Sequence, residues 1–247
     1  MGGMVRLVSV VDSLRKKYPD LILVDSGDFL NTYLLTKADS LMWYFMAKVN
    51  FDAVGVGDQE YVEGSSFLLA QQKQFPLPLV NCNILTAETE RSAFARYKII
   101  RRENVKIGIV AVIFPESFEF ILEKSIRILP AVESLGKLVP ELKAKTDLLI
   151  LLCHGGFDKT RAVAQAFPEI PVLLAGHSQE KREAILPGQV VVQPGVDGEY
   201  LGFLVIENKA GRWSFRNHFI PVNPVFPENR DFRLKVDEYY RQLKEGK

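Results

Sequence analysis

The stretch GVGDQEYVEG at residues 55–64 places a run of polar side chains directly after an apolar segment. The preceding FDAVGV has the composition of a short buried strand, and the glycine at 57 permits a tight turn at its end. Asp58, Gln59 and Glu60 then supply side-chain oxygen atoms in succession. Such an ending is typical of either a turn or a ligand site, and the other strand ends of the chain help to decide between them.

Three further apolar segments end in the same way. LILV at 21–24 runs into Asp28 through the sequence DSGD, LLILLC at 148–153 runs into His154, and VLLAG at 172–176 runs into His177. The carboxyl ends of strands in an α/β sheet converge on one edge, where ligands bind. The sequence therefore predicts that Asp28, Asp58, His154 and His177 meet there.

A structural interpretation competes for each of these residues taken alone. An aspartate after a strand is more often a turn or capping residue, and a single histidine is more often a hydrogen-bonded structural residue. Four such endings in one chain, using two of its three histidines, favour a shared site. We interpret the third histidine, His218, as structural and Asp25 as a brace of its turn.

Two imidazoles and two carboxylates form a mixed nitrogen and oxygen ligand set, which suits Zn, Mn or Fe better than Ca. The two cysteines lack metal-type spacing. Strand alternation predicts that Cys153 points into the core, away from its neighbour His154.

Composition excludes several classes of protein. The chain has 247 residues, of which 47% are hydrophobic and 25% charged, as in an ordinary globular domain. A formal net charge of +1 gives no support for nucleic-acid binding or a membrane-surface role. No apolar run approaches the ~18–20 residues that span a bilayer, and no signal peptide is visible.

The order of elements favours a single α/β domain with mixed sheets. Strands alternate with helices as far as about residue 176, and a β-meander follows. Helices are expected at 4–17, 38–49, 65–73, 131–143, 159–166 and 232–243. Strands are expected at 21–24, 52–56, within FPLPLVNCNI, in a hairpin at 96–113 that turns at 103–104, at 147–153 and at 172–176. Three antiparallel strands are expected in QVVVQPG, EYLGFLVIEN and RWSFRNHFIPV.

Four motifs in this order carry a family resemblance: GD at 27–28, GDQE at 57–60, LLCHGG at 151–156 and AGHSQ at 175–179. The chain resembles the calcineurin-like metallophosphoesterases, and within them the 5'-nucleotidase/UDP-sugar hydrolase branch. The resemblance implies a four-layer α/β/β/α sandwich with two mixed sheets and two metal ions at the strand ends. It implies a metallophosphoesterase-like domain over 1–223, followed by a connector and amphipathic helix over 224–247.

The resemblance also implies individual roles. Asp28 matches the aspartate that bridges the two metals, and Asp58 stands where the family has an asparagine ligand. His154 and His177 match the two histidines of the second metal, and Gln179 matches a glutamine at the first. One metal site is therefore complete, whereas the other has only Asp28 and Gln179. The Asp-x-His of the family's first strand is absent from this sequence, so we expect an N-terminally incomplete domain that lacks this strand.

The expected activity follows from a second departure. Gln59 occupies the position of the family's catalytic histidine, and Val62 that of its aspartate partner. Glutamine cannot shuttle a proton near neutral pH. We therefore expect a metallophosphoesterase-like protein related to the 5'-nucleotidases, which hydrolyse phosphate esters of nucleotides, with weakened or lost activity. The alternative is a non-catalytic module that binds a metal or an anion.

The resemblance also bears on cofactor, ligand and compartment. It implies a divalent metal cofactor and a small phosphorylated or anionic ligand, while the net charge of +1 and the lack of a long apolar run predict no nucleic-acid or membrane partner. It suggests a periplasmic or exported protein, although the chain shows no signal peptide.

Overall fold

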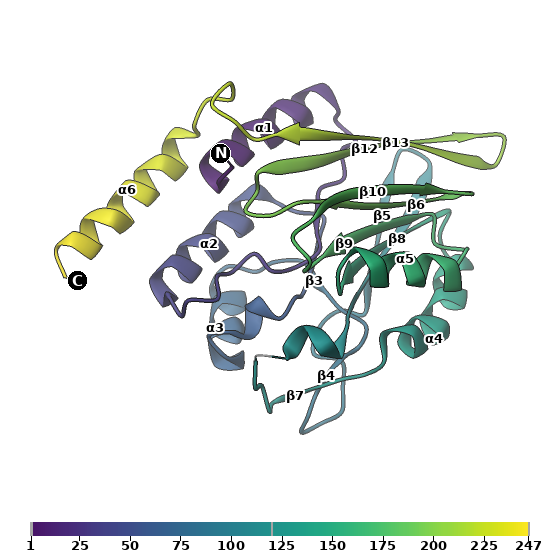
Figure 1. The fold of residues 1–247 in the computed structure, drawn as a ribbon, viewed down its shortest axis with the longest axis horizontal. Helices are drawn as coiled ribbons and strands as arrows, with labels where there is room; N and C mark the ends of the chain where they lie inside the picture. Colours follow the sequence, from purple (N-terminus) through teal and green to yellow (C-terminus); the bar gives the residue numbers. More distant parts are fainter. Residues whose placement is uncertain (1, 120, 247) are drawn as a thin grey trace.

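The computed structural model describes residues 2–119 and 121–246. The two segments expected at 1–223 and 224–247 include Met1, Phe120 and Lys247, which lie outside the described residues. Within the described part the chain forms a mixed α/β structure, as expected from the order of its elements (Figure 1).

Helices occupy both flanks of the structure. The α-helices are α1 (Met4–Lys17), α2 (Thr36–Val49), α3 (Ser65–Gln74), α4 (Ala131–Lys143), α5 (Phe157–Ala166) and α6 (Arg230–Lys244). Two 3-10 turns are η1 (Gln59–Tyr61) and η2 (Pro115–Phe118). All six expected helices are confirmed, with small differences at their ends. The last helix starts two residues early because the Asn229 side chain accepts hydrogen bonds from the N–H groups of Asp231 and Phe232.

Strands within the described residues fall into several sheets. They are β1 (Val24–Asp25), β2 (Ala53–Gly55), β3 (Leu79–Val80), β4 (Ile84–Thr86), β5 (Tyr97–Arg102), β6 (Val105–Ile113), β7 (Ile126–Ile128), β8 (Leu148–His154), β9 (Val172–Gly176), β10 (Lys181–Leu186), β11 (Gln189–Pro194), β12 (Tyr200–Lys209) and β13 (Arg212–Pro221).

The largest sheet in the described part has six strands in the order β10-β11-β9-β8-β6-β5. Its four inner strands are parallel, and β5 and β10 close the edges in antiparallel fashion. The inner strands are continuously apolar because both faces are covered. Helices α4 and α5 pack on one face, and β2 approaches β6 and β8 from the other.

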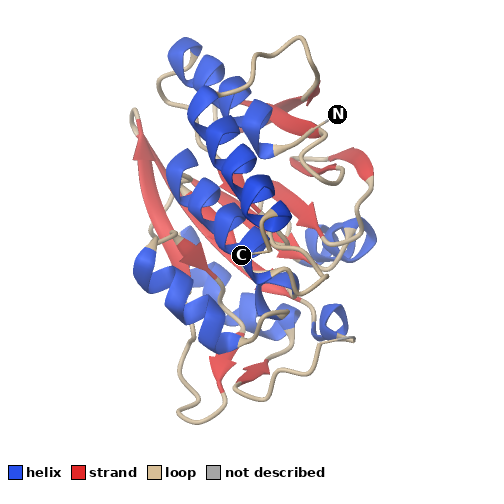
Figure 2. Cartoon of the chain, turned by 90° about the vertical axis from the view of Figure 1, so that its left-hand side faces the viewer, coloured by secondary structure: helices blue, strands red, loops and turns tan. Residues whose placement is uncertain are grey.

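A smaller parallel sheet, β1-β2-β3, lies on that second face. Helices α1, α2 and α6 contact one another and lie on the same side of the molecule (Figures 1 and 2). The carboxyl ends of β1 and β2 therefore lie near those of β8 and β9. The full four-layer sandwich implied by the resemblance stays a prediction.

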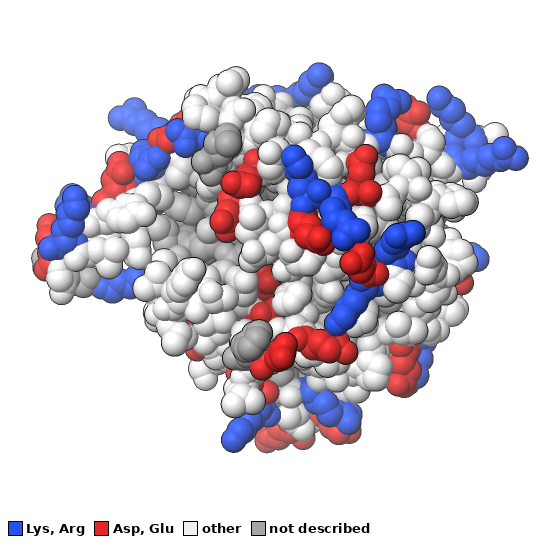
Figure 3. Space-filling model, in the orientation of Figure 1, with Lys and Arg blue, Asp and Glu red and all other residues white. Residues whose placement is uncertain are grey.

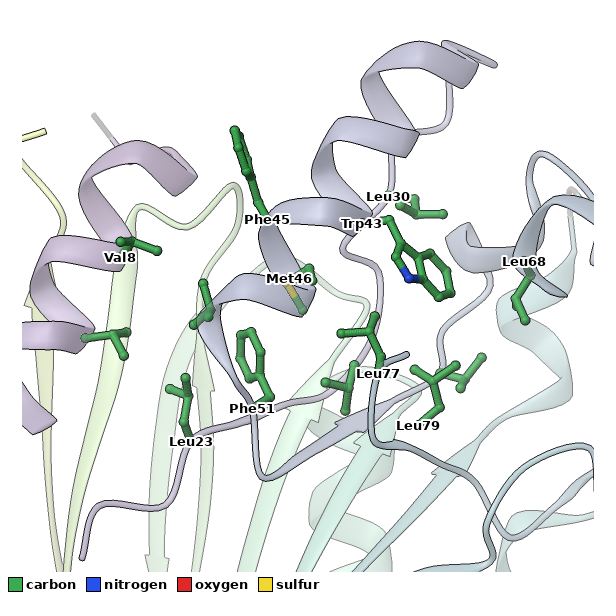
Figure 4. Close-up of a cluster of buried hydrophobic side chains, with 14 of the residues drawn as sticks. Val8, Leu23, Leu30, Trp43, Phe45, Met46, Phe51, Leu68, Leu77 and Leu79 are labelled. Carbon is green, nitrogen blue, oxygen red and sulfur yellow. The ribbon is translucent and has the colours of Figure 1, made fainter. Parts of the chain in front are cut away.

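The core beneath α2 holds this smaller sheet in place. Trp43 is fully buried, and its indole N–H donates to the Phe75 carbonyl at 2.8 Å. Trp43 and Met46 point toward Leu77 and the β3 residue Leu79, whereas Phe45 projects from another face of the helix (Figure 4). Phe45 stacks on Phe232 of α6 with ring centroids 4.3 Å apart. Helix α2 therefore joins the sheet to the C-terminal helix.

Two strand predictions are wrong in detail. LILV was expected to be a fully buried strand, but β1 covers only Val24–Asp25 and both residues are half-buried. Its neighbour Leu23 instead uses its N–H to reach the Asp52 carboxylate at 3.0 Å. FPLPLVNCNI was expected to contain one strand, but it feeds β3 and β4, which belong to different sheets. Asn81 causes the break, because its side-chain oxygen accepts the N–H groups of Asn83 and Ile84.

The predicted antiparallel meander is correct only for β12 and β13. QVVVQP forms β11, which pairs in parallel with β9 inside the large sheet. Its residues from Gln189 to Gln193 are all buried, as an interior strand requires. Strand β10 was not predicted, since its sequence KREAIL begins with three charged residues and resembles a polar loop. In the structure its residues alternate between exposed and half-buried.

Charged side chains of both signs lie on the surface. Acidic and basic side chains are interspersed over the face in Figure 3, without a dominant patch of one sign. No helix in the described residues combines the length and apolar character needed to cross a bilayer.

Candidate metal centre

Four side chains from four strand ends converge on one point. Asp28, Asp58, His154 and His177 each offer one ligand atom, and these atoms lie within 4.8 Å of one another. The predicted convergence is therefore confirmed. It arises because β1 and β2 in the small sheet, and β8 and β9 in the large one, run parallel and end at the same edge.

The distances within the cluster suit a shared cation. Nε2 of His154 lies 3.0 Å from Oδ1 of Asp58 and 3.2 Å from Oδ2 of Asp28. Nδ1 of His177 lies 3.1 Å from the same Asp58 oxygen and 3.8 Å from the same Asp28 oxygen. His154 is buried, whereas His177 is about a third exposed and leaves the cluster accessible from one side.

A hydrogen bond to the Ser26 carbonyl fixes the orientation of the His154 ring. Its Nδ1 lies 2.9 Å from the Ser26 carbonyl oxygen, which can only accept, so Nδ1 carries a proton and donates. Nε2 is left facing the two carboxylates. A histidine whose second nitrogen donates to a carbonyl is the usual arrangement of a metal ligand. The Ser26 hydroxyl in turn donates to the Leu174 carbonyl of β9 at 3.0 Å.

Glycines allow the loops to approach this closely. A Cβ atom at Gly57 would lie 2.3 Å from Oδ1 of Asp28 and 2.6 Å from Cε1 of His154. A Cβ atom at Gly27, whose φ is +94°, would lie 2.4 Å from the Gly57 nitrogen. Both positions therefore exclude any side chain.

The carboxylates and imidazoles shift one another's proton affinities. Burial alone would lower the pKa of His154, but hydrogen bonds with Asp28 and Asp58 outweigh it and raise this pKa to about 10. Hydrogen bonds with the same carboxylates raise the pKa of His177 to about 9. Burial opposes ionisation of Asp28 and Asp58, yet the bonds from the histidines hold the pKa of each below its usual range. Without a metal, the cluster is a paired set of imidazolium and carboxylate ions at neutral pH.

Known proteins share this fold and about a quarter or less of the aligned sequence. No family model matches the chain. Human 5'-nucleotidase is 26% identical over 282 aligned residues, which cover 98% of this chain and 49% of that protein. The structure of the sulfate thiohydrolase SoxB from Thermus thermophilus, in complex with glycerol, superposes with a TM-score of 0.89 at 18% identity and covers 99% of this chain and 48% of its own. The structure of the calcineurin-like phosphoesterase YfkN from Bacillus subtilis superposes with a TM-score of 0.81 at 22% identity. The match covers 99% of this chain and 90% of that one.

The chain is a homologue of the 5'-nucleotidases with a calcineurin-like phosphoesterase fold. Its other relatives include 2',3'-cyclic-nucleotide 2'-phosphodiesterase/3'-nucleotidases. The chain spans about half the length of the curated relatives it matches, 49% for the human protein.

The remaining residues predicted for the site have distinct positions. Gln59 begins η1, and its backbone N–H donates to Oδ1 of Asp28 at 3.0 Å. The role of its side chain at the catalytic position stays a prediction. Gln179 follows His177 in a loop where both residues have positive φ, and its role as a metal ligand also stays a prediction. Ser178 between them accepts the Phe157 N–H at 3.2 Å and so joins this loop to the start of α5.

The structural interpretations of Asp25 and Cys153 are confirmed, whereas that of His218 stays a prediction. Asp25 accepts the Gly27 N–H at 2.8 Å and so braces its turn, and burial raises the pKa of its carboxyl to about 6. Cys153 is fully buried in the core on the far side of its strand from the cluster, and burial raises the pKa of its thiol to about 12. His218 lies exposed on β13, in register with Phe203.

One residue that contacts the cluster loops was not assigned a role from the sequence. Glu60 is completely buried, and its carboxylate accepts backbone N–H groups from both the Asp28 loop and the Asp58 loop. Burial raises the pKa of Glu60 above its usual range, and these N–H groups act in the opposite direction. The sequence analysis only grouped Glu60 with Asp58 and Gln59 as side chains that supply oxygen atoms after FDAVGV.

Proposed function

We propose that this chain is the metal-binding domain of a nucleotide phosphoesterase and that its turnover is weakened. The observation behind the proposal is the convergence of four ligand atoms within 4.8 Å at the strand ends of a calcineurin-like fold. The substrate class would be small phosphate esters of nucleotides, as the names of the relatives suggest.

The residues present fit one divalent cation. Two carboxylates and two imidazoles balance its charge and match the donors that Zn, Mn and Fe prefer. Asp28, Asp58, His154 and His177 would hold it. A bound divalent cation would polarise a phosphoryl oxygen and lower the pKa of a coordinated water towards ~7.

The chain's own residues account for a weak activity. His177 borders the open side of the cluster, where a phosphate ester can approach. Gln59 can orient a ligand by hydrogen bonds, but its amide neither accepts nor releases a proton near neutral pH. Proton transfer to a leaving group would therefore depend on solvent, which supports slow turnover rather than the rate of a complete site.

The test is hydrolysis of p-nitrophenyl phosphate and of nucleoside monophosphates with added Mn²⁺ or Zn²⁺. We expect slow, metal-dependent turnover that His177→Ala abolishes and His218→Ala leaves unchanged, because His218 is exposed on β13. Equal background rates in all three proteins would refute phosphoesterase activity.

A second candidate is a non-catalytic module that binds a metal or an anion. The pair Gln59 and Val62 favours it, because both members of the family's proton-handling pair are replaced. Metal analysis after purification without chelators distinguishes the two candidates. One tightly held ion without metal-dependent hydrolysis would favour the non-catalytic module.

A further inference from the structure

Glu60 connects the two loops that carry the aspartates of the cluster. Its Oε2 accepts the N–H groups of Gly57 at 2.7 Å and Asp28 at 3.0 Å. Its Oε1 accepts the N–H groups of Phe29 at 2.9 Å and Leu30 at 3.4 Å. The side chain is fully buried, so water does not compete for these four donors.

The same bonds hold Asp28 in an unusual backbone conformation. Asp28 has a φ of +66°, which places it in the left-handed region that non-glycine residues seldom adopt. Its N–H is fixed by Glu60, and its Oδ1 accepts the Gln59 N–H at 3.0 Å. Both ends of Asp28 are therefore tied to the segment 57–60, which also contains Asp58.

We infer that Glu60 is a positioning residue that sets the separation of the Asp28 and Asp58 carboxylates and thereby the metal affinity of the cluster. The inference rests on the proposed function, because it assumes the divalent cation that the proposed function requires. Glu60 contributes no ligand atom to the four-residue cluster. It acts through the backbone, because displacing the two loops relative to each other breaks either its one hydrogen bond to the Asp58 loop, from Gly57, or its three hydrogen bonds to the Asp28 loop.

The chemistry of the side chain makes the inference testable by replacing a single oxygen atom. Both oxygens of Glu60 face only N–H donors, so an acceptor is required on each. Glu60→Gln keeps the volume but turns an NH₂ group towards two N–H groups, which repel it. The loops must then separate or rotate.

The experiment is a Co²⁺ titration of the full chain, followed by its visible d–d absorption and by calorimetry. Outer-shell partners of metal ligands typically change affinity by about 10–100-fold, and we expect Glu60→Gln to weaken Co²⁺ binding within that range and to alter the d–d spectrum. The matched control is Asp52→Asn, because Asp52 also accepts a backbone N–H, from Leu23, but at the opposite end of β2. This control should lose stability and keep the wild-type Co²⁺ affinity and spectrum.

A measurement without metal separates this inference from the proposed function. The ring NMR signals of His154 and His177 in metal-free protein report their distances to the two carboxylates. We expect them to shift in Glu60→Gln and to stay in place in Asp52→Asn. If the wild-type chain fails to bind Co²⁺, the proposed function is refuted, and these signals still decide the role of Glu60.

Unchanged Co²⁺ affinity and unchanged histidine signals in Glu60→Gln would overturn the inference. If that variant does not fold, Glu60→Asp replaces it, since aspartate keeps the charge but is one methylene too short to reach both loops. A folded Glu60→Asp with weakened Co²⁺ binding supports the inference, and one with wild-type binding and wild-type histidine signals overturns it.

Discussion

Oδ1 of Asp58 lies 3.0 Å from Nε2 of His154, although 96 positions separate the two residues in the chain. The contact joins the small sheet to the large one at the edge where their strands end. The same Asp58 oxygen lies 3.1 Å from Nδ1 of His177. One carboxylate oxygen therefore organises both imidazoles, which makes Asp58 the centre of the cluster.

Metal binding should release protons. At pH 7 both histidines carry their extra proton, since the pKa of His154 is raised to about 10 and that of His177 to about 9. Each must lose it to bind a cation. We expect calorimetric titration with Zn²⁺ at pH 7, in two buffers of different ionisation enthalpy, to show release of close to two protons. His177→Ala should release fewer, and equal heats in both buffers for the wild type would contradict the assignment.

The metal-free protein should lose stability at alkaline pH. A histidine with a raised pKa in the folded state stabilises it fully below the unfolded pKa, near ~6.5, and this contribution is lost as the pH rises through the folded value. For this cluster the loss should occur between pH 7 and about 10, the upper folded value. Urea unfolding at pH 7, 9 and 10 measures it.

The aspartates give the opposite dependence. The pKa values of Asp28 and Asp58 are lowered by their histidine partners, so their contribution to stability is present above pH ~3.8 and lost as the pH falls below it.

The control for the alkaline prediction compares two histidine variants. His177→Gln should reduce the loss of stability at alkaline pH, whereas the exposed His218→Gln should not. If the loss of stability at alkaline pH is unchanged in His177→Gln, other groups cause it.

Restoring the proton-handling pair should raise turnover. Gln59→His combined with Val62→Asp places an imidazole at the start of η1 (Gln59–Tyr61) and its carboxylate partner directly after the last residue of η1. General acid–base catalysis typically contributes about 10²–10⁴-fold, and we expect metal-dependent hydrolysis of p-nitrophenyl phosphate to rise within that range. Gln59→Asn with Val62→Asp serves as the control. A folded, metal-loaded double variant without increased turnover would favour the non-catalytic module.

Loss of the Phe232 ring should destabilise the C-terminal helix. This ring is 7% exposed and stacks on Phe45, and it is the buried anchor of α6. Phe232→Ala should lower the free energy of unfolding by about 3 kcal/mol, within the range for buried phenylalanines. Tyr240→Ala on the same helix should change it by under ~0.5 kcal/mol, because Tyr240 is 57% exposed. Urea unfolding followed by circular dichroism compares the two, and equal effects would show that α6 is not anchored through Phe232.

The pattern of apolar and polar residues was sufficient to predict the helices and the convergence of four polar side chains. Continuous apolar runs such as LLILLC had to be buried on both faces, which predicted β8 and placed His154 at its carboxyl end. The same pattern failed for β11. A buried run looks alike whether its partner strand is parallel or antiparallel, and the choice of β9 as partner depends on a contact between distant segments.

The sequence by itself determined which residue types stand at the ends of the buried strands, because burial of apolar side chains follows from local composition. Tertiary structure alone decided the distances between them and the contacts of the Glu60 carboxylate. The partners of that carboxylate are backbone N–H groups, which every residue except proline possesses and which therefore leave no signature in the sequence. Their arrangement exists only once the two loops are folded against each other.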